Sequence, residues 1–191
     1  MKKVGLYFGS FNPIHMGHVV IAQYMREFSD LDEVWLIVTP HNPFKKKANL
    51  LDDRARYNLV QRSVESIPGL RASDVEFSLP QPSYTTDTLA HLKEQHPELR
   101  FCLIMGSDNL SNLHKWKNAE YLVTNYSVYV YPRSDGGSGP YTDHESVMVV
   151  DAPQMDLSSS FIRQAISEGK DVSAMVPSSA WQEIREMHYY E

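Results

Sequence analysis

One segment of the chain is more informative than any other: Gly9-Ser10-Phe11-Asn12-Pro13-Ile14-His15-Met16-Gly17-His18. The apolar residues 4–8 before it are typical of a buried strand, and residues 17–29 have the apolar spacing of a helix. A tight turn therefore delivers two imidazoles, those of His15 and His18, to the start of a helix. Glycine lets another group approach the backbone closely, and proline stiffens the turn.

This histidine turn, residues 9–18, is well placed to bind an anion. The first N–H groups of a helix lack partners within it and carry about half a positive charge, which favours phosphate. The two imidazoles can donate hydrogen bonds to the same anion. A metal site and ordinary helix-cap histidines are the alternatives, but no nearby Cys, Asp or Glu completes a ligand set. Because the P-loop and Gly-x-Gly-x-x-Gly patterns are both missing from the sequence, we predict another kind of phosphate site.

The histidine turn resembles the Gly-x-Phe-x-Pro-x-His-x-Gly-His signature of the nucleotidyltransferase superfamily. Its fixed residues rarely coincide by chance within so short a stretch, so the signature is specific. Members of this superfamily join a nucleotide to a phosphorylated acceptor and release pyrophosphate. The resemblance implies that Gly9, Ser10, Phe11 and His18 contact ATP, and it leaves several acceptors open.

Length and composition predict a single domain over residues 1–191, and the resemblance implies that it is a nucleotidyltransferase domain. This length, with 42% hydrophobic and 22% charged residues, suits one domain with a substantial core. The net charge of −6 argues against nonspecific nucleic-acid binding. Cys102 is the only cysteine, so no intrachain disulfide can form, which fits a reducing cytoplasm. With neither an apolar membrane span nor a secretory signal, we expect a cytoplasmic protein without membrane or nucleic-acid partners; a homo-oligomer stays open.

Apolar runs alternate with helical patterns along the chain. Strands are expected at residues 4–8, 34–38, 101–105 and 127–131, with weaker candidates at 74–79 and 147–150. Helices are expected at residues 17–29, 52–66, 86–96, 109–123, 159–168 and 178–188, the last two in a small C-terminal helical part at about 157–191. The alternation predicts an α/β fold: a Rossmann-like, doubly wound parallel sheet with helices on both faces. In such folds ligands bind beyond the carboxyl ends of the strands.

A second phosphate cradle is predicted at Ser158-Ser159-Ser160-Phe161-Ile162-Arg163. Capping of a helix start explains one or two of these hydroxyls, but three in a row followed by arginine also suit phosphate oxygens. The segment resembles the Ile-Ser-Ser-Thr-x-Ile-Arg motif, with which the superfamily grips the triphosphate of ATP. Leu157 and Ser160 depart from that motif, although Ser160 keeps the hydroxyl. The resemblance implies that Ser159, Ser160 and Arg163 bind ATP.

A lysine run follows the second expected strand: Pro40-His41-Asn42-Pro43-Phe44-Lys45-Lys46-Lys47. Such a run is usually a solvated surface patch, but two prolines limit the freedom of this loop, which suits a phosphate contact. Relatives with nicotinate-type acceptors carry Pro-Pro-His-Lys or a related sequence here, and this chain matches it in part. The resemblance implies that Lys45 is the counterpart of the family lysine.

The segment Ser83-Tyr84-Thr85-Thr86-Asp87-Thr88-Leu89 discriminates between acceptors. It is a hydroxyl-rich helix start whose N–H groups could receive a carboxylate, and capping by itself also accounts for such a sequence. It resembles, at every fixed position, the Ser-Tyr-Thr-x-Asp-Thr-Leu motif of the nicotinate-nucleotide adenylyltransferases. There the segment helps to bind the nicotinate end of the acceptor, which implies an acceptor contact from Thr85.

Two further positions follow the strand expected at 101–105. Asp108, in Gly106-Ser107-Asp108, could simply cap a helix; the family resemblance implies that Gly106 and Asp108 hold the nucleotide, with the carboxylate near ribose hydroxyls. Trp116 could be a half-buried core aromatic. Its position resembles that of the family aromatic that stacks on the pyridine ring of the acceptor.

Together these resemblances imply adenylyl transfer from ATP to nicotinate mononucleotide, giving nicotinate adenine dinucleotide and pyrophosphate. The acceptor phosphate is already ionised near neutral pH, so catalysis rests on positioning and charge stabilisation, with Mg²⁺ arriving on ATP. The expected catalytic residues are His15, His18, Lys45 and Arg163. The expected acceptor contacts are Ser10, His15, Lys45, Thr85 and Trp116.

Other functions remain open at the level of sequence. Nicotinamide-mononucleotide and phosphopantetheine adenylyltransferases are the nearest rivals, and residues 83–89 argue against the second more than the first. A noncatalytic nucleotide sensor with the same fold would not need to keep every charge-stabilising residue. A metal-binding module would hold stoichiometric transition metal after purification.

Overall fold

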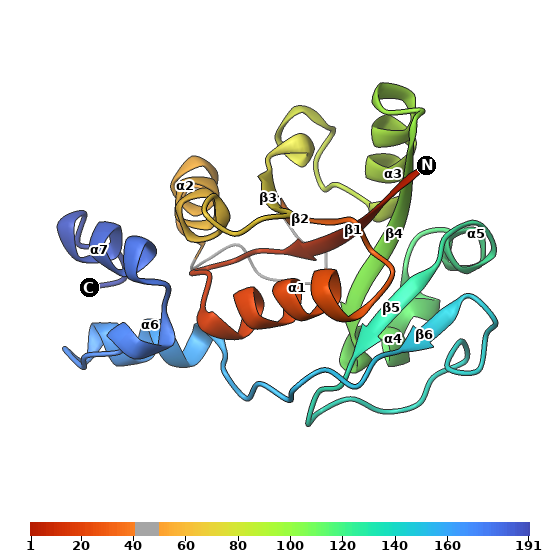
Figure 1. The fold of residues 1–191 in the computed structure, drawn as a ribbon. Helices are drawn as coiled ribbons and strands as arrows, with labels where there is room; N and C mark the ends of the chain where they lie inside the picture. The colour runs from red at the N-terminus through yellow and green to blue at the C-terminus, as the bar shows by residue number, and fades with distance from the viewer. Residues whose placement is uncertain (41–49) are drawn as a thin grey trace.

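The structure is a computed structural model that describes residues 1–40 and 50–191, and its described part contains one six-stranded sheet (Figure 1). Neighbouring strands all pair in parallel, in the order β3-β2-β1-β4-β5-β6. The strands are β1 (Lys2–Gly9), β2 (Glu33–Val38), β3 (Leu70–Ser73), β4 (Leu99–Gly106), β5 (Val128–Tyr131) and β6 (Val147–Val149).

Helices cover both faces of the sheet. They are α1 (Met16–Phe28), α2 (Asp53–Val64), α3 (Thr85–Gln95), α4 (Ser107–Asn112), α5 (Ala119–Asn125), α6 (Ser159–Ser167) and α7 (Ser178–Glu186), with short 3-10 turns at η2 (Val75–Ser78), η3 (Leu113–Lys115) and η4 (Ser173–Met175). One core cluster joins α1, α2, α6 and α7 to the sheet, and a second joins α3, α4 and α5 to its other face. The predicted Rossmann-like, doubly wound α/β fold is confirmed.

The strands bury side chains on both faces, which explains why their sequences are apolar throughout. Leu6 and Leu103 belong to the core cluster under α3–α5, whereas Tyr7 and Ile104, the next residues in each strand, belong to the opposite cluster. Successive side chains of a strand point to opposite faces, so a strand covered twice has no polar side.

The strand order places a crevice between β1 and β4. The chain runs from β1 through β2 to β3 on one side, then crosses to β4 on the other side of β1. This reversal leaves room beyond the carboxyl ends of β1 and β4, where ligands of open α/β sheets bind. Gly9 and Gly106, the last residues of the two strands, border that crevice.

Two expected elements differ from the structure. Residues 74–79 do not form a strand: bonds from Phe77 N–H to Asp74 O and from Leu79 N–H to Glu76 O close a 3-10 turn, and the strand lies earlier, at β3. The strand was predicted because apolar Val75 and Phe77 alternate with polar residues, as they would along a half-buried strand. The helix expected at 109–123 is broken, because Asn118 has a φ of 56°, which a right-handed helix cannot contain.

Local capping fixes the starts and ends of the helices that carry the site. The Asp52 carboxylate accepts the N–H groups of Arg54 and Ala55 at the start of α2, and Ser158 Oγ accepts the N–H of Phe161 at the start of α6. Gly169, with a φ of 70°, follows α6. These are the polar start and glycine end that sequence rules predict.

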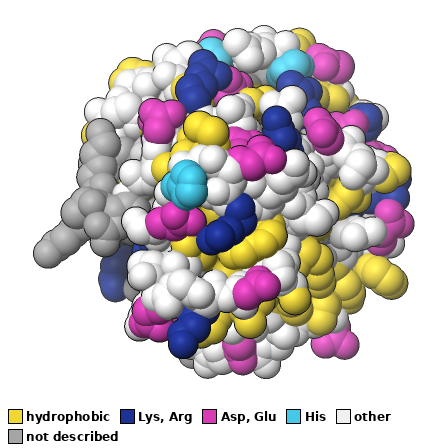
Figure 2. Space-filling view, turned by 90° about the vertical axis from the view of Figure 1, so that its left-hand side faces the viewer, with side chains coloured by type: hydrophobic (Ala, Val, Ile, Leu, Met, Phe, Trp, Pro, Cys, Tyr) yellow, Lys and Arg dark blue, Asp and Glu magenta, His cyan; other side chains and the backbone are white. Residues whose placement is uncertain are grey.

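Figure 2 shows the side of the molecule that carries α7 in Figure 1. Positive and negative side chains are interspersed over this face, with hydrophobic side chains gathered between them. Among the helices of the described residues, none is long and apolar enough to cross a membrane.

Candidate active site

The histidine turn orients its imidazoles through the backbone. The main-chain N–H of His15 donates to Nδ1 of His18 over 3.2 Å, and the N–H of His18 donates to His15 O over 2.9 Å. The two rings stack with centroids 3.6 Å apart. Because His18 Nδ1 accepts a hydrogen bond, the neutral ring carries its proton on Nε2. His18 is therefore prepared to donate a hydrogen bond from Nε2.

His15 is in a different electrostatic environment. Its side chain is only 4% exposed, and burial, aided by the nearby positive charge of Arg133, lowers its pKa to about 4. The ring is therefore neutral at pH 7. Its buried Nδ1 has no hydrogen-bond partner among the described residues, which leaves a polar atom available at the start of α1.

The start of α6 docks directly on the histidine turn. Ser159 Oγ donates to Pro13 O over 2.9 Å, and Arg163 Nη1 donates to Asn12 O over 2.7 Å. Arg163 Nη2 also lies 3.3 Å from Ser160 Oγ. The two cradles predicted from sequence thus form one pocket of about 360 Å³, which we call the imidazole pocket, lined by residues that include His15, His18, Arg133, Ser159, Ser160 and Arg163.

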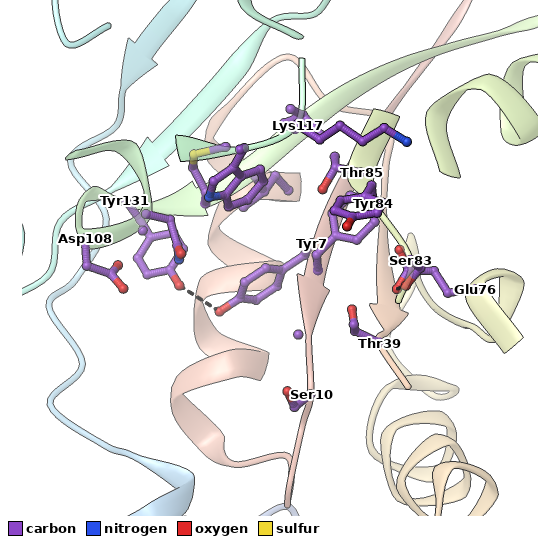
Figure 3. A pocket seen from close by; sticks show the side chains of 18 residues that line it. Tyr7, Ser10, Thr39, Glu76, Ser83, Tyr84, Thr85, Asp108, Lys117 and Tyr131 are labelled. Carbon is purple, nitrogen blue, oxygen red and sulfur yellow. Dashed lines mark hydrogen bonds between the residues drawn. The ribbon is translucent and has the colours of Figure 1, made fainter. Parts of the chain in front are cut away.

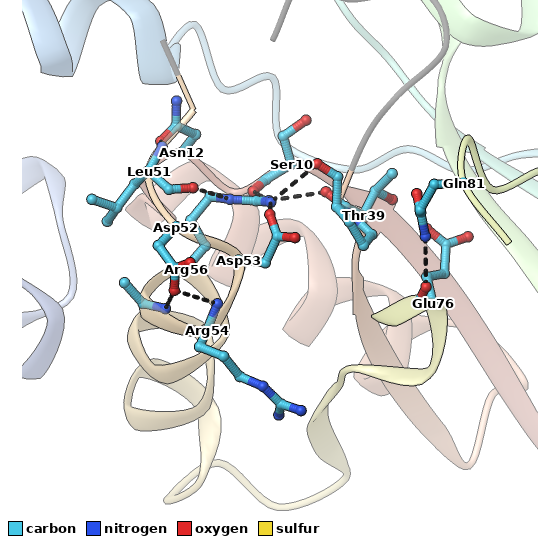
Figure 4. A network of polar contacts seen from close by, with 12 residues as sticks. Ser10, Asn12, Thr39, Leu51, Asp52, Asp53, Arg54, Arg56, Glu76 and Gln81 are labelled. Atoms are coloured by element: carbon cyan, nitrogen blue, oxygen red, sulfur yellow. Dashed lines mark hydrogen bonds and ion pairs between the residues drawn. The ribbon is translucent and has the colours of Figure 1, made fainter. Parts of the chain in front are cut away.

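A buried arginine fixes the strand ends beside this pocket (Figure 4). Arg56 is fully buried; its Nη1 donates to Ser10 O over 2.5 Å and to Thr39 O over 2.9 Å, and its charge is paired with Asp53. It therefore ties the end of β1 to the end of β2. Arg56 was not among the residues predicted from sequence, although an arginine on the apolar face of α2, one turn before Leu59, was a usable signal.

A second pocket, of about 220 Å³, lies on the other side of Gly9 and Ser10 (Figure 3). We call it the tryptophan pocket, because Trp116 lines it where the broken helix leaves η3. Thr85, the first residue of α3, and Thr39, just after β2, also line it. Gly9, Ser10 and Asp108 line both pockets, so the two cavities meet at the histidine turn.

Glu76 organises the hydroxyl-rich segment from inside the protein. Ser83 Oγ donates to one oxygen of Glu76 over 2.9 Å, and Thr88 Oγ1 donates to the other over 2.7 Å. Burial raises the pKa of Glu76, although these hydrogen bonds oppose the rise. Two hydroxyls of the motif are thus used by the fold, while Thr85 lines the pocket. No sequence pattern singled out Glu76, because residues 74–79 have the alternation of a strand.

Gly106 and Asp108 meet at the end of β4. A Cβ on Gly106 would lie 2.3 Å from Oδ1 of Asp108, so a side chain at this position would displace the carboxylate. That buried Oδ1 has no hydrogen-bond partner within the described residues, and Arg133 Nε lies 4.0 Å away. The hydroxyls of Tyr7 and Tyr131, 3.1 Å apart, lie beside both pockets (Figure 3).

The described site residues predicted from sequence all line one of the two pockets. Gly9, Ser10 and Asp108 line both; Phe11, His15, His18, Ser159, Ser160 and Arg163 line the imidazole pocket; Gly106, Thr85 and Trp116 line the tryptophan pocket. Lys45 lies outside the described residues. Of these two pockets, His15 lines only the imidazole pocket and Gly106 only the tryptophan pocket. In residues 1–40 and 50–191, no group of three or more His, Cys, Asp or Glu side chains could hold a metal ion.

Three lining residues that no sequence pattern singled out are Tyr7, Tyr131 and Arg133. Tyr131 ends β5, Arg133 follows it, and Tyr7 lies near the end of β1. Their position at the carboxyl ends of strands was the available signal.

Comparisons with known proteins agree with this arrangement. Residues 6–165 match the model of the cytidylyltransferase-like family. Proteins of Flavobacterium johnsoniae and Christiangramia forsetii, each named "probable nicotinate-nucleotide adenylyltransferase", are 49% identical to this chain; the matches cover 99% and 100% of this chain and 99% of each relative.

A solved structure shares the fold. The Plasmodium falciparum nicotinic acid mononucleotide adenylyltransferase complexed with NaAD superposes with a TM-score of 0.82 at 21% identity, covering 100% of this chain and 98% of that chain. The family match and the near-complete coverage of relatives at 49% identity decide the assignment. The chain belongs to the cytidylyltransferase-like family and, within it, to the nicotinate-nucleotide adenylyltransferases.

Proposed function

We propose that this protein transfers the adenylyl group of ATP to nicotinate mononucleotide, forming nicotinate adenine dinucleotide and pyrophosphate, a step of NAD biosynthesis. One observation carries the proposal: two pockets of different chemistry meet at Gly9 and Ser10. One is lined by imidazoles, hydroxyls and two arginines, and the other by an indole and a helix start. A reaction between two phosphorylated ligands needs such a junction.

The imidazole pocket suits the phosphates of ATP. His18 Nε2, Arg163 and the hydroxyls of Ser159 and Ser160 are the donors that phosphate oxygens accept. Gly9, Ser10 and Phe11 would bring the backbone of the turn against the nucleotide. Asp108, whose buried Oδ1 has no hydrogen-bond partner in residues 1–40 and 50–191, would accept hydrogen bonds from ribose hydroxyls. Gly106 leaves that carboxylate the room it needs.

The tryptophan pocket suits the pyridine end of the acceptor. Trp116 would stack on the flat, electron-poor ring. Thr85 and the first N–H groups of α3 would receive the nicotinate carboxylate, because a helix start favours an anion. Ser10 and His15 would hold the acceptor phosphate where the two pockets meet. Lys45 is proposed on the family resemblance as a further phosphate contact.

The chemistry follows from placing two ionised ligands end to end. The acceptor phosphate is already an oxyanion, so it attacks the α-phosphorus of ATP without a general base, and pyrophosphate leaves in line. His15 is neutral, and His18 presents Nε2–H to the oxygens on which negative charge grows. Arg163 would neutralise the departing pyrophosphate. Mg²⁺ bound to ATP would supply further charge neutralisation at the phosphates.

A pyrophosphate-release assay tests the proposal. Purified protein with Mg²⁺ and ATP is given nicotinate mononucleotide, nicotinamide mononucleotide or phosphopantetheine, and the dinucleotide product is identified by mass. We expect release with the nicotinate compound and at least tenfold lower kcat/KM with the amide, which lacks the charge that the start of α3 favours. Equal use of the amide would refute the nicotinate preference. Tight ATP binding without release for any acceptor would identify a sensor.

A further inference from the structure

The residues that follow α7 turn back toward the histidine turn. The N–H of Tyr189 donates to Ile184 O over 3.0 Å, and His188 adopts a left-handed φ of 54°, which reverses the chain direction. The Glu191 carboxylate contacts Arg185 over 3.1 Å and His188 over 2.7 Å. The reversed segment therefore has a defined conformation, which directs the side chain of Tyr190 toward the histidine turn.

That tyrosine reaches the histidine turn directly. The hydroxyl of Tyr190 donates to Oδ1 of Asn12 over 2.9 Å, and Asn12 itself is only 5% exposed. Burial raises the pKa of the Tyr190 phenol, although Arg56 and Arg163 oppose the rise. The hydroxyl therefore keeps its proton at neutral pH and remains a donor.

Asn12 is a junction between segments that are distant in the sequence. Its Oδ1 also accepts the N–H of Leu51 over 3.1 Å, just before α2, and its main-chain oxygen accepts Arg163 Nη1 over 2.7 Å. It follows Phe11, which lines the imidazole pocket, and precedes the cap residue His15 by three positions. A displacement of Asn12 would therefore move both the imidazoles and the guanidinium.

We propose that Tyr190 is a positioning residue for the adenylyl transfer proposed above: through Asn12 it holds the histidine turn and Arg163 in the geometry that the nucleotide phosphates require. The inference rests on that proposed function. Tyr190 acts from behind the turn and lines neither pocket. Loss of the Tyr190 hydroxyl should therefore weaken ATP binding and lower kcat. Binding of the pyridine ring of the acceptor should be unaffected.

Tyr190→Phe and Tyr189→Phe form a matched pair. Each removes one hydroxyl from the same segment, but the Tyr189 hydroxyl has no hydrogen bond within the described part of the chain. We expect Tyr190→Phe to lower kcat/KM for ATP roughly tenfold, as loss of one buried hydrogen bond at a reacting site would. The KM for nicotinate mononucleotide should change less than kcat/KM for ATP, because only the phosphate of this acceptor, and not its ring, would contact the histidine turn. Tyr189→Phe should have the wild-type kcat/KM for ATP and the wild-type KM for nicotinate mononucleotide.

Two measurements separate positioning from general stability. In a double-mutant cycle, Tyr190→Phe should have little further effect on kcat/KM when Asn12 is already Ala, because the hydroxyl acts through that side chain. The Kd for α,β-methylene-ATP, measured by calorimetry at a temperature where both phenylalanine variants are fully folded, should rise roughly fivefold in Tyr190→Phe and stay unchanged in Tyr189→Phe. Additive effects in the cycle, or equal losses in the two phenylalanine variants, would overturn the inference.

The binding measurement also keeps the two proposals distinct. If the wild type releases no pyrophosphate with any acceptor, adenylyl transfer is refuted and the Kd comparison alone decides the role of Tyr190. If the wild type is active and Tyr190→Phe equals Tyr189→Phe in kcat, KM and Kd, only the positioning role is refuted.

Discussion

At the scale of single residues, two histidines three positions apart acquire different properties. His15 is buried beside Arg133, while the Nδ1 of His18 accepts a backbone N–H and so directs its proton to Nε2. The sequence predicted both imidazoles at a helix start. It could not predict the lowered pKa of His15, which depends on burial and on Arg133, more than a hundred residues away. The stacking of the rings and the tautomer of His18 depend on the exact path of the turn.

Replacing His18 by Ala should remove a donor that acts on the charge developing in the transition state. We expect kcat to fall by roughly 10²–10³-fold, the usual effect of deleting one such donor. The fold should be intact, since His18 is only partly buried. Single-turnover kinetics with circular dichroism check this. Near-normal turnover in a correctly folded variant would exclude His18 from the catalytic set.

The lowered pKa of His15 makes stability depend on pH. In the unfolded chain His15 has a pKa near 6.5, whereas in the folded chain it binds a proton only near pH 4. Stability is therefore lost as the pH falls through this window, by on the order of 3 kcal/mol relative to His15→Gln. Urea unfolding at pH 7 and pH 4.5 measures it, with exposed His114→Gln as the control. Parallel losses in wild type and His15→Gln would contradict the assignment.

At the scale of elements, the start of α3 depends on a neighbour that the sequence did not identify. The hydroxyl-rich segment at residues 83–89 was predicted correctly as a helix start, and α3 begins at Thr85. The expected strand at 74–79 was wrong, because Glu76 turns inward to accept Ser83 and Thr88. Local alternation of apolar residues cannot reveal a carboxylate whose partners come from the next helix.

Glu76→Ala should therefore loosen the start of α3. It leaves two hydroxyls without their acceptor, so we expect the free energy of unfolding to fall by roughly 2–3 kcal/mol and the KM for nicotinate mononucleotide to rise. In Glu76→Gln, the free energy of unfolding and the KM for nicotinate mononucleotide should both be close to their wild-type values.

The raised pKa of Glu76 gives a second readout. The folded protein holds this proton more tightly than the unfolded chain, so the stability of the wild type relative to Glu76→Gln should decrease as the pH rises from 4 to 7. Urea unfolding at several pH values measures the difference. A difference that grows with pH would contradict the direction of the shift.

At the scale of the whole molecule, the sheet order brings the two pockets to one turn. We infer that residues 1–191 act as one domain, because α6 and α7 share a core cluster with α1 and α2. Residues from Tyr7 to Arg163 contribute to the imidazole pocket. Loss of either pocket should leave the other able to bind its ligand.

Thermal unfolding tests this separation. Mg²⁺ with ATP at about 100 times its Kd should stabilise the protein by about 2.7 kcal/mol, or roughly 5–10 °C in Tm. Arg163→Ala should lose most of that shift and keep the one produced by nicotinate mononucleotide. Trp116→Ala should show the reverse pattern. If one substitution abolished both shifts without unfolding the protein, the two-pocket assignment would be wrong.

The sequence by itself determined the α/β class, the histidine turn, the hydroxyl-rich helix start and the family resemblance, because each is built from short segments whose patterns are local. The tertiary structure alone decided how these segments meet. The crossover from β3 to β4 sets the crevice beside β1, Arg56 ties two strand ends together, and Tyr190 returns to Asn12. Such contacts join distant segments by burial and hydrogen bonding, which no local pattern encodes.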